Sequence, residues 1–406
     1  MSRVAAPLTA WPVAIAHVDV AELQSAPARQ LGPNYLCVFW ADGAPVGQIY
    51  GASDPGEAVA LDVLARKAGI DVARPSAAPE TQRQTTAPTV SLVICTRDRP
   101  AELARCLASL PAQTRAPDQV LVVDNASRDD ATRRAAMEAG VEYVREDQPG
   151  LDIARNTGAL RARGEIVAYT DDDVVLHPRW LERLADAFDE EHVWAATGLV
   201  LPAELATEAQ CVFERHWGFG RGFARKDFGT AFYRSSRQRG CPAWEIGAGA
   251  NMAFRRRVFD AVGLFDERLD VGAAGCSGDS ELWYRILYRG GTCRYEPAAV
   301  VFHHHRRGFD ALARQIRAYM SGHAAALLVQ YERTGDRGNL RRLLLTLPRR
   351  YAGQLKRRLA SGRDYTNCLL KEEIAGCVAG VLYYLRSPRP KPPHRAAGGA
   401  LSALRS

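Results

Sequence analysis

The sequence offers little support for a disulfide framework, a thiolate metal site or a membrane-spanning helix. Its nine cysteines are scattered and include no Cys-x-x-Cys pair, which argues against the first two and favours reduced thiols in the cytoplasm. Pro7, Pro12, His17 and Asp19 interrupt the first segment, so we expect no signal peptide. The nearest candidate for a membrane span, residues 374–385, is about a dozen residues long and too short to cross a bilayer.

Two common phosphate-binding signatures are also missing from the sequence. No Gly-x-Gly-x-x-Gly follows the first strand of the alternating β-α region that starts at Val90, and no Gly-Lys-Ser/Thr loop occurs in the chain. A dinucleotide-binding fold and a P-loop enzyme are therefore disfavoured. Any phosphate group that this chain binds must be held in another way.

Positive charge is concentrated at the C-terminal end. The chain has 53 Lys and Arg against 46 Asp and Glu, a net charge of +7. From Arg306 onward there are 20 basic and 6 acidic residues, a surplus of 14, so the preceding part carries −7. The acidic and basic parts of the chain are therefore expected to have different roles.

Changes in composition divide the chain into four parts. Residues 1–72 are predicted to be an accessory α+β segment, either a small module or an extra layer on the main domain, and residues 73–89, rich in Ala, Pro, Thr and Gln, a linker. The main α/β domain is predicted over 90–307 and a helical, basic region over 308–406. In the first part we expect strands at 13–20, 35–40 and 46–50 and a helix at 57–68.

From Val90 the sequence alternates between short apolar runs and amphipathic helices. We expect strands at 90–95, 120–123, 141–144 and 165–170, with helices from Pro100, over 129–139, over 151–162 and after Pro178. Repeated β-α-β units require right-handed crossovers and a mainly parallel sheet. The predicted fold class is therefore α/β, with a mixed, mainly parallel sheet flanked by helices. Thr96, Asp124 and Asp171 then reach the same edge of that sheet.

The strand at 165–170 ends in three adjacent carboxylates, Asp171, Asp172 and Asp173. Ligands of open α/β sheets bind at this edge, and clustered carboxylates repel one another unless a cation or hydrogen bonds compensate them. Mg²⁺ and Mn²⁺ are suitable cations because they prefer oxygen ligands. For these residues considered alone, a solvated acidic turn is the simpler alternative.

Seven short motifs, in one order along the chain, together resemble glycosyltransferase family 2. They are VSLVICTRDR at 90–99, VVDNAS at 122–127, ARNTG at 154–158, TDDDV at 170–174, GAGANMAFRR at 247–256, VGLFDER at 262–268 and GDSEL at 278–282. Each motif alone is weak, whereas the ordered set is specific. The resemblance implies a GT-A type fold, a nucleotide-diphosphate sugar donor, Mg²⁺ or Mn²⁺, and inversion at the sugar carbon. It covers neither the first 89 residues nor most of the tail.

By position, the resemblance also assigns roles on the donor side. Thr96 and Asp124 would recognise the nucleotide, with Asp124 at the base, and Arg155 would complete that pocket. Asp171 and Asp173 would form the Asp-x-Asp pair, one on the metal and the other near the ribose, with Asp172 beside them. Which of the three holds the metal stays open. Taken singly, Asp124 could instead be a turn former and Arg155 a surface arginine.

On the acceptor side, the resemblance implies that Asp279 is the catalytic base. The commoner Glu-Asp pair is replaced by Gly278-Asp279, so Glu281 is a fallback, and an N-cap role for Asp279 is the alternative. After the predicted strand at 299–302, His305 or its neighbour His303 could reach the metal or the diphosphate. Arg306 could serve the phosphates instead.

Two further segments have more than one interpretation. Residues 202–245 interleave aromatic residues with arginines, which favours either an acceptor-side lid or ordinary core packing. The tail after residue 308 alternates basic and apolar clusters, which favours contact with an anionic membrane or a helical bundle packed on the main domain.

We therefore predict an inverting, metal-dependent glycosyltransferase that acts on a saccharide or lipid-linked acceptor and lies in the cytoplasm, at the inner face of the membrane. A catalytically silent nucleotide-sugar binding protein is the alternative. A nucleotidyltransferase is disfavoured because Thr96-Arg97-Asp98-Arg99 is not its Gly-rich signature. No nucleic acid partner is expected, because the main domain is acidic.

Overall fold

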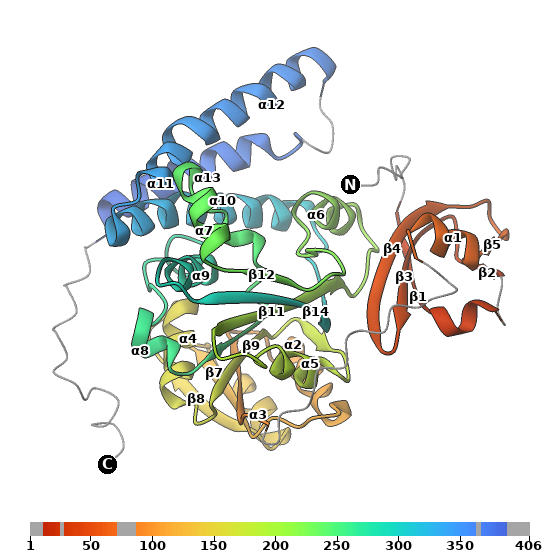
Figure 1. Cartoon of the computed structure of the whole chain (residues 1–406), viewed down its shortest axis with the longest axis horizontal. Coiled ribbons are helices and arrows are strands. Elements are labelled where there is room, and N and C mark those ends of the chain that lie inside the picture. Colours follow the sequence, from red (N-terminus) through yellow and green to blue (C-terminus); the bar gives the residue numbers. More distant parts are fainter. Residues whose placement is uncertain (1–10, 25–27, 71–86, 363–366, 388–406) are drawn as a thin grey trace.

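The computed structural model describes residues 11–24, 28–70, 87–362 and 367–387. Figure 1 shows an N-terminal module beside a central α/β domain, with long C-terminal helices on the opposite side of that domain. The predicted linker lies outside the described residues except for positions 87–89.

The N-terminal module is a small α+β unit, as predicted. A three-stranded sheet has the order β1-β3-β4, and a two-stranded sheet pairs β2 with β5. The elements are β1 (Ala14–Asp19), η1 (Val20–Gln24), β2 (Ala28–Gln30), β3 (Asn34–Ala41), β4 (Ala44–Ala52), β5 (Ala58–Ala60) and α1 (Leu61–Lys67). The helix expected over 57–68 begins only at Leu61, because residues 58–60 form a strand that pairs antiparallel with β2.

The module packs as an extra layer on the central domain. The Trp40 ring of β3 stacks on His177, with ring centroids 5.0 Å apart and planes 17° apart. Arg179 donates a hydrogen bond from Nη1 to the backbone oxygen of Asp42 at 2.8 Å, and Val13 forms an isolated antiparallel bridge with Leu205. The segment therefore has features of both predicted arrangements, with a hydrophobic cluster of its own and a second cluster shared with the central domain.

The central sheet has the order β10-β14-β11-β13-β9-β6-β7-β8, with the short β12 paired to β14. Its strands are β6 (Val90–Thr96), β7 (Gln119–Asn125), β8 (Glu142–Glu146), β9 (Ile166–Asp171), β10 (Val174–Leu176), β11 (Val193–Pro202), β12 (Lys226–Phe228), β13 (Asn251–Arg255) and β14 (Thr292–His303). The four strands β9, β6, β7 and β8 are parallel, and β13 runs antiparallel to both of its neighbours. Most side chains of β6 are buried, as expected for a strand covered on both faces.

Helices cover both faces of the sheet, in the mixed, mainly parallel α/β arrangement that the sequence predicts for a GT-A type fold. They are α2 (Pro100–Leu107), α3 (Ala131–Glu138), α4 (Leu151–Arg161), α5 (Trp180–Asp186), α6 (Glu208–Trp217), α7 (Thr230–Ser236), α8 (Val258–Val262) and α9 (Gly278–Tyr288). In α2, Pro100 occupies the first turn, where its missing N–H has no intrahelical partner, and Leu103 and Leu107 face the core. In α4, Gly158 permits close contact, because a Cβ there would lie 2.4 Å from Val93.

The register of the parallel strands brings the predicted residues to one edge. Thr96 lies opposite Asp124 in the β6–β7 pair, and Cys95 lies opposite Asp171 in the β6–β9 pair. The strand-end prediction is therefore confirmed for all three positions.

Asn251 fixes the antiparallel strand β13 in the middle of the sheet. The β11–β14 pairing shifts register between Gly198 and Leu199, and the fully buried Asn251 fills this irregularity. Its Nδ2 donates hydrogen bonds to the backbone oxygens of Leu199 at 3.0 Å and Ala299 at 2.8 Å. Its Oδ1 accepts from the indole N–H of Trp180 at 2.8 Å. The loop that enters β13, residues 247–250, is thereby held against the sheet edge.

The C-terminal region is helical, as predicted. It consists of α10 (Phe309–Thr334), α11 (Arg337–Arg341), a π-helical turn η5 (Arg342–Thr346), α12 (Leu347–Ser361) and α13 (Leu370–Arg386). Leu312 and Ile316 of α10 pack with Phe213 of the central domain. Gly376 and Gly380 let α13 approach α10 closely, because a Cβ at Gly380 would lie 2.0 Å from the Ser321 oxygen. No helix among the described residues is long and apolar enough to cross a membrane.

Candidate active site

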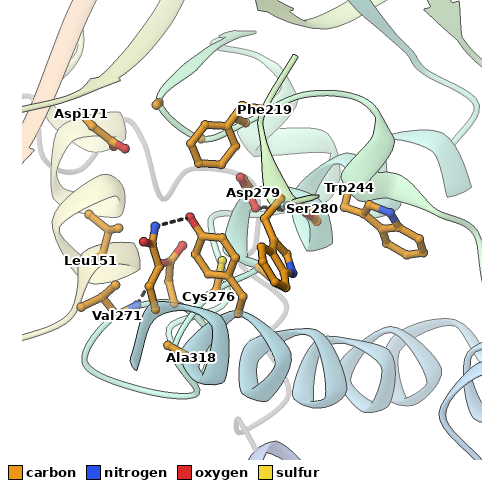
Figure 2. Close-up of a pocket in the computed structure, with 18 of the residues that line it drawn as sticks. Leu151, Asp171, Phe219, Trp244, Val271, Cys276, Asp279, Ser280 and Ala318 are labelled. Atoms are coloured by element: carbon orange, nitrogen blue, oxygen red, sulfur yellow. Dashed lines mark hydrogen bonds between the residues drawn. The ribbon is translucent and has the colours of Figure 1, made fainter. Parts of the chain in front are cut away.

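A cavity of about 1090 Å³ opens at the carboxyl edge of β6 and β9. Its walls come from the strand ends, from the loops around residues 216–219 and 244–250, and from α10 of the C-terminal region. Figure 2 shows Asp171 on one side of this cavity, Phe219 above it, and Asp279 with Ser280 facing the same space. The predicted residues that line it are Thr96, Arg155, Asp171, Asp172, Asp173, Asp279, His303 and Arg306.

Asp172 is turned toward the first strand. Its carboxylate accepts hydrogen bonds from Thr96 Oγ1 at 2.7 Å and from Arg99 Nη1 at 2.5 Å. Burial raises the pKa of Asp172 to about 7, although Arg99 opposes that shift. Both carboxylate oxygens are engaged within the protein, so Asp172 ties the loop after β6 to the end of β9.

Asp173 lies between two cationic groups. Arg99 Nη2 donates to Asp173 at 2.8 Å, and His303 Nε2 lies 3.2 Å from Asp173 Oδ1. Burial opposes ionisation, but His303 and Arg99 outweigh it and hold the pKa of Asp173 well below its usual range. The same pairing raises the pKa of His303 against its burial. Asp171 faces the cavity, and its pKa is raised to about 6 by burial and by the neighbouring Asp173.

One group of side chains in this edge has the chemistry of a divalent metal site. The ligand atoms of Asp171, Asp173 and His303 all lie within 4.8 Å of one another. Asp173 Oδ1 is buried, and the neighbour on which its pairing depends is His303 Nε2 at 3.2 Å, the third member of this group, so no residue outside the group competes for that oxygen among the described residues. Carboxylate oxygens with one imidazole nitrogen fit Mn²⁺, and the carboxylates alone fit Mg²⁺.

The structure brings His303, rather than His305, to the two aspartates. His303 ends β14, and the pairing with β10 sets it opposite Val174, next to Asp173. His305 lies behind it: its Nε2 bonds to Glu214 Oε2 at 2.9 Å, and its Nδ1 is 2.9 Å from His303 Nδ1. As a correction to the sequence prediction, His305 therefore supports His303 and does not reach the acidic cluster.

Asp124 is fully buried and does not line the cavity. Its carboxylate accepts hydrogen bonds from Tyr143 Oη at 2.8 Å and from the backbone N–H of Ser127 at 3.1 Å. Arg145 Nη1 lies 3.4 Å from Oδ2 of the same carboxylate. In this arrangement Asp124 holds the turn after β7, which is the turn-former alternative, while the next residue, Asn125, faces the cavity. Contact between Asp124 and a nucleotide base stays a prediction.

Arg155 is buried between two carboxylates that the sequence did not single out. Its Nη1 donates to Asp152 at 3.0 Å, one turn earlier on α4, and to Asp270 at 2.6 Å. Arg155 is thus a cavity residue inside an acidic pair and not a surface arginine. Burial and the adjacent Asp270 raise the pKa of Asp152 well above its ordinary value. Asp270 itself adopts a left-handed backbone conformation, with φ of 63°.

Gly278 has a steric reason to be glycine. A Cβ at position 278 would lie 1.9 Å from Asp152 Oδ2, which is itself buried and has no hydrogen-bond partner among the described residues. The Asp152 carboxylate therefore occupies the space that a side chain at 278 would need. Where the commoner pattern has a glutamate, this chain has Gly278. The carboxylate of Asp152, on α4, lies beside that position instead.

Asp279 is a half-buried acid in the first turn of α9. Its Oδ1 accepts hydrogen bonds from the backbone N–H of Ser280 at 2.6 Å and from Ser280 Oγ at 3.1 Å. Burial raises its pKa, with Arg155 as the main opposing charge. The N-cap position belongs to Ser277, so Asp279 is not the helix cap. The fallback residue Glu281 is fully buried in an ion pair with Arg285 at 2.8 Å and does not line the cavity.

The aromatic segment between 202 and 245 contributes to the core, which is one of its two interpretations, and also to the wall of the cavity, whereas its role as an acceptor-side lid stays a prediction. Phe213, Phe228 and Tyr233 are buried in hydrophobic clusters. Trp217, Phe219 and Trp244, by contrast, line the cavity. These planar side chains form an apolar wall opposite the acidic edge.

Residues 91–263 match the model of the family described as glycosyl transferase family 2. This match confirms the resemblance to glycosyl transferase family 2 that the ordered motifs predict. The matched segment contains the strand ends, the three aspartates and Arg155, whereas Asp279 and His303 follow it.

Curated relatives share parts of the chain. The O-antigen biosynthesis protein RfbC of Myxococcus xanthus is 31% identical over 211 residues, which is 50% of this chain and 16% of that protein. The glucosyl-dolichyl phosphate glucuronosyltransferase of Haloferax volcanii is 26% identical over 184 residues, 44% of this chain and 56% of that protein. The matched region thus spans between about a sixth and about a half of these relatives' lengths.

Among solved structures, a mannosyltransferase from Pyrobaculum calidifontis in complex with GDP-Man and Mn²⁺ is 21% identical in sequence. The superposition has a TM-score of 0.47 and covers 75% of this chain and 89% of that one. Glucosyl-3-phosphoglycerate synthase from Mycobacterium tuberculosis is 19% identical in sequence. Its superposition has a TM-score of 0.42 and covers 60% of this chain and 80% of that enzyme.

The close contact between Gly278 and Asp152 predicts that a side chain at 278 is not tolerated. Gly278→Ala is expected to lower the free energy of unfolding in urea by about 1–3 kcal/mol, because the methyl group must displace the Asp152 carboxylate from Arg155. In the double variant with Asp152→Ala, the loss is expected to be smaller than the sum of the single losses. Gly353→Ala is the matched control, since nothing lies within 4 Å of a Cβ there. Equal stability of the Gly278 and Gly353 variants would contradict the steric explanation.

Proposed function

We propose that the chain is an inverting, metal-dependent glycosyltransferase that moves a sugar from a nucleotide-diphosphate sugar to a hydroxyl acceptor, either a saccharide or a lipid-linked glycan. The observation that carries the proposal is one cavity that is lined both by the group Asp171, Asp173 and His303, whose ligand atoms lie within 4.8 Å of one another, and by the half-buried acid Asp279. The match of residues 91–263 to glycosyl transferase family 2 supports the same conclusion.

On the donor side, Asp171, Asp173 and His303 would hold Mn²⁺ or Mg²⁺. When bound, the ion would neutralise charge that builds up on the departing diphosphate. Arg99 keeps Asp173 ionised, and Asp172 keeps the loop at Thr96 in place through its hydrogen bond. Arg97 and Arg306 also line the cavity and offer cationic groups to phosphates.

On the acceptor side, Asp279 would act as the general base. The acceptor oxygen forms a bond to the anomeric carbon while the bond from that carbon to the diphosphate oxygen breaks, which inverts the configuration. The hydroxyl proton passes to Asp279, so its carboxylate must be ionised when the reaction begins. Its hydrogen bonds from Ser280 engage Oδ1 and leave Oδ2 for the acceptor.

Replacing the base is expected to separate catalysis from binding. In Asp279→Asn the release of nucleoside diphosphate should fall by about 10²–10⁴-fold, while the Kd for the donor stays the same, because the amide cannot accept the proton. For the unmodified enzyme, the rate should fall as the pH decreases through a value above 3.8, since burial raises the pKa of Asp279 from there. Kinetics from pH 4 to 8 would check both effects.

Asp260→Asn, at an exposed position on α8, serves as the control and should retain full activity. Unchanged turnover in the Asp279 variant would exclude Asp279 as the base. If the unmodified protein binds donor but never releases product with any acceptor, the catalytically silent binding protein becomes the better interpretation.

The metal cluster predicts cation-dependent donor binding. Screening UDP- and GDP-sugars with Mn²⁺ or Mg²⁺ should find a donor that raises the melting temperature by several degrees, as expected for about 2–3 kcal/mol of stabilisation at saturating ligand. His303→Ala should weaken this response, whereas His304→Ala should not, because the His304 side chain is outside the cluster. A screen in which no donor responds, with or without metal, would reject metal-dependent donor binding.

We further propose that the C-terminal helices rest on an anionic membrane surface. Large apolar side chains are exposed along η5, α12 and α13: Leu344, Leu345, Leu355, Leu359, Ile374, Val378, Leu382 and Leu385. Leu359 and Leu385 are 79% and 70% exposed. Exposed basic residues, among them Arg349, Lys356 and Arg357, lie on the same α12, which projects from the molecule in Figure 1. Apolar area combined with basic charge is typical of helices that bind anionic bilayers.

Sedimentation with vesicles tests this surface. The protein should bind phosphatidylglycerol-containing vesicles and bind pure phosphatidylcholine vesicles more weakly, because basic residues are attracted to anionic headgroups. Leu355→Ser combined with Leu359→Ser should weaken binding by at least about tenfold, given the apolar area removed. Leu160→Ser, on α4 and 47% exposed, is the control. Equal binding by both variants would argue against a membrane role for α12.

A further inference from the structure

Beyond Asp279, the cavity continues into a compartment made largely by the C-terminal helices. In the view of Figure 2, Asp279 and Ser280 are drawn between Asp171 on one side and Trp244 on the other. Past Trp244, the lining comes from His323 of α10, Arg342 of η5, Arg350 of α12 and Glu373 of α13. We call this part, defined by Trp244, His323, Arg342 and Arg350, the helical compartment.

Arg342 is held in a fixed position in the helical compartment. Its guanidinium lies over the Trp244 ring, 4.0 Å from the centroid, and its Nε donates a hydrogen bond to His323 Nε2 at 3.2 Å. Burial lowers the pKa of His323 to about 3, so this imidazole is neutral. Because Nε2 accepts, the proton of the neutral ring is on Nδ1, and His323 adds no positive charge beside Arg342.

The charge of Arg342 is only weakly compensated. Within the described part of the chain, no carboxylate lies at ion-pair distance from Arg342, and Glu245 acts on it only at longer range. Burial, followed by the nearby Arg350, lowers the pKa of Arg342 to about 10. Arg350 is 3.9 Å from Glu373 Oε2, an oxygen without a hydrogen-bond partner in the described residues. Two cations therefore face the same space, and of the two carboxylates that line it, Glu373 is paired with Arg350 and Glu245 is beyond ion-pair distance of Arg342.

The fully buried arginines of the described chain are compensated by carboxylates. Arg155 pairs with Asp152 and Asp270, Arg285 with Glu281, and Arg294 with Asp189, Glu190 and Asp227. Arg221, which lines the same cavity, donates from its terminal nitrogens to the backbone oxygens of Gly218 and Trp244 instead. Arg342 is half-buried, and its terminal nitrogens have no such acceptor among the described residues, so they can bind a ligand. The stem of Arg342 does pack against Gly240, which anchors η5, but this contact does not engage the guanidinium.

We propose that the helical compartment binds a phosphate group carried by the acceptor. This inference rests on the proposed function, because it assumes that the acceptor hydroxyl lies at Asp279 and the remainder of the acceptor beyond it. Arg342 offers its two terminal nitrogens as a planar fork, Arg350 adds a second cation, and His323 holds Arg342 in position by accepting from its Nε. Holding the phosphate there orients the hydroxyl toward the donor sugar.

Phosphate on a membrane lipid and phosphate on a soluble sugar share this chemistry, so the test includes both. Calorimetry on the full chain without donor would compare farnesyl phosphate, glucose 1-phosphate and uncharged farnesol. We expect the phosphates to bind, and Arg342→Gln to weaken that binding by about 10–100-fold, the range for losing a charge-assisted hydrogen bond. Arg341→Gln, at the adjacent exposed position outside the cavity, should bind like the unmodified protein.

The outcomes separate the possibilities. Tighter binding of farnesyl phosphate than of glucose 1-phosphate identifies a lipid-borne phosphate, and comparable binding identifies a soluble one. The proposal is overturned if neither phosphate binds, if farnesol binds as tightly as farnesyl phosphate, or if the Arg342 and Arg341 variants bind alike.

Two controls keep the conclusion independent of folding and of the donor site. Arg350→Gln, at a side chain that is 53% exposed, repeats the test without disturbing the Trp244 contact and should also weaken phosphate binding. Donor binding with Mn²⁺ is measured separately on each variant and should be unchanged. If the unmodified protein does not bind donor, the result counts against the proposed function. If it binds donor but Arg342→Gln leaves phosphate binding unchanged, the result counts against the phosphate site alone.

Discussion

Burial of several carboxylates around one cavity is the constraint on which the rest of the site depends. Such groups are stable only where cations and hydrogen bonds compensate them. The chain meets this requirement with two separate groups of residues. Arg155 lies between Asp152 and Asp270, and Arg99 with His303 flanks Asp173. The pKa values diverge accordingly, with Asp173 held well below its usual range and Asp172 raised to about 7. Adjacent acids can therefore exist in different protonation states, which allows them different roles.

Much of the fold and the location of the site could be predicted from the sequence, because both depend on local pattern. Alternating apolar runs mark the strands, and parallel β-α-β units bring their carboxyl ends together. Thr96 and the aspartates 171–173 consequently reach one edge, whatever the details of the loops. The helical nature of the tail likewise follows from its periodicity.

Other features depend on contacts between residues that are far apart in the chain. Gly278 is explained by Asp152, which comes from a different helix and could not be identified from the motif around either residue. The choice between His303 and His305 depends on where β14 ends and how it pairs with β10. The burial of Asp124 depends on Tyr143 from the neighbouring strand. In each case the local pattern is correct, but contacts with distant parts of the chain decide the position of the side chain.

The participation of α10 and η5 in the cavity has a consequence for how such a protein can diversify. The segment that matches the family ends at residue 263, and the ends of β6 and β9, with Thr96 and the three aspartates, lie within it. The opposite end of the same cavity is closed by helices from a later part of the chain, joined to the sheet by packing rather than by strand pairing. Residues on these helices can therefore change without altering the register of the sheet. One half of the cavity is constrained by the architecture of the fold, and the other half is free to vary with the molecule that it encloses.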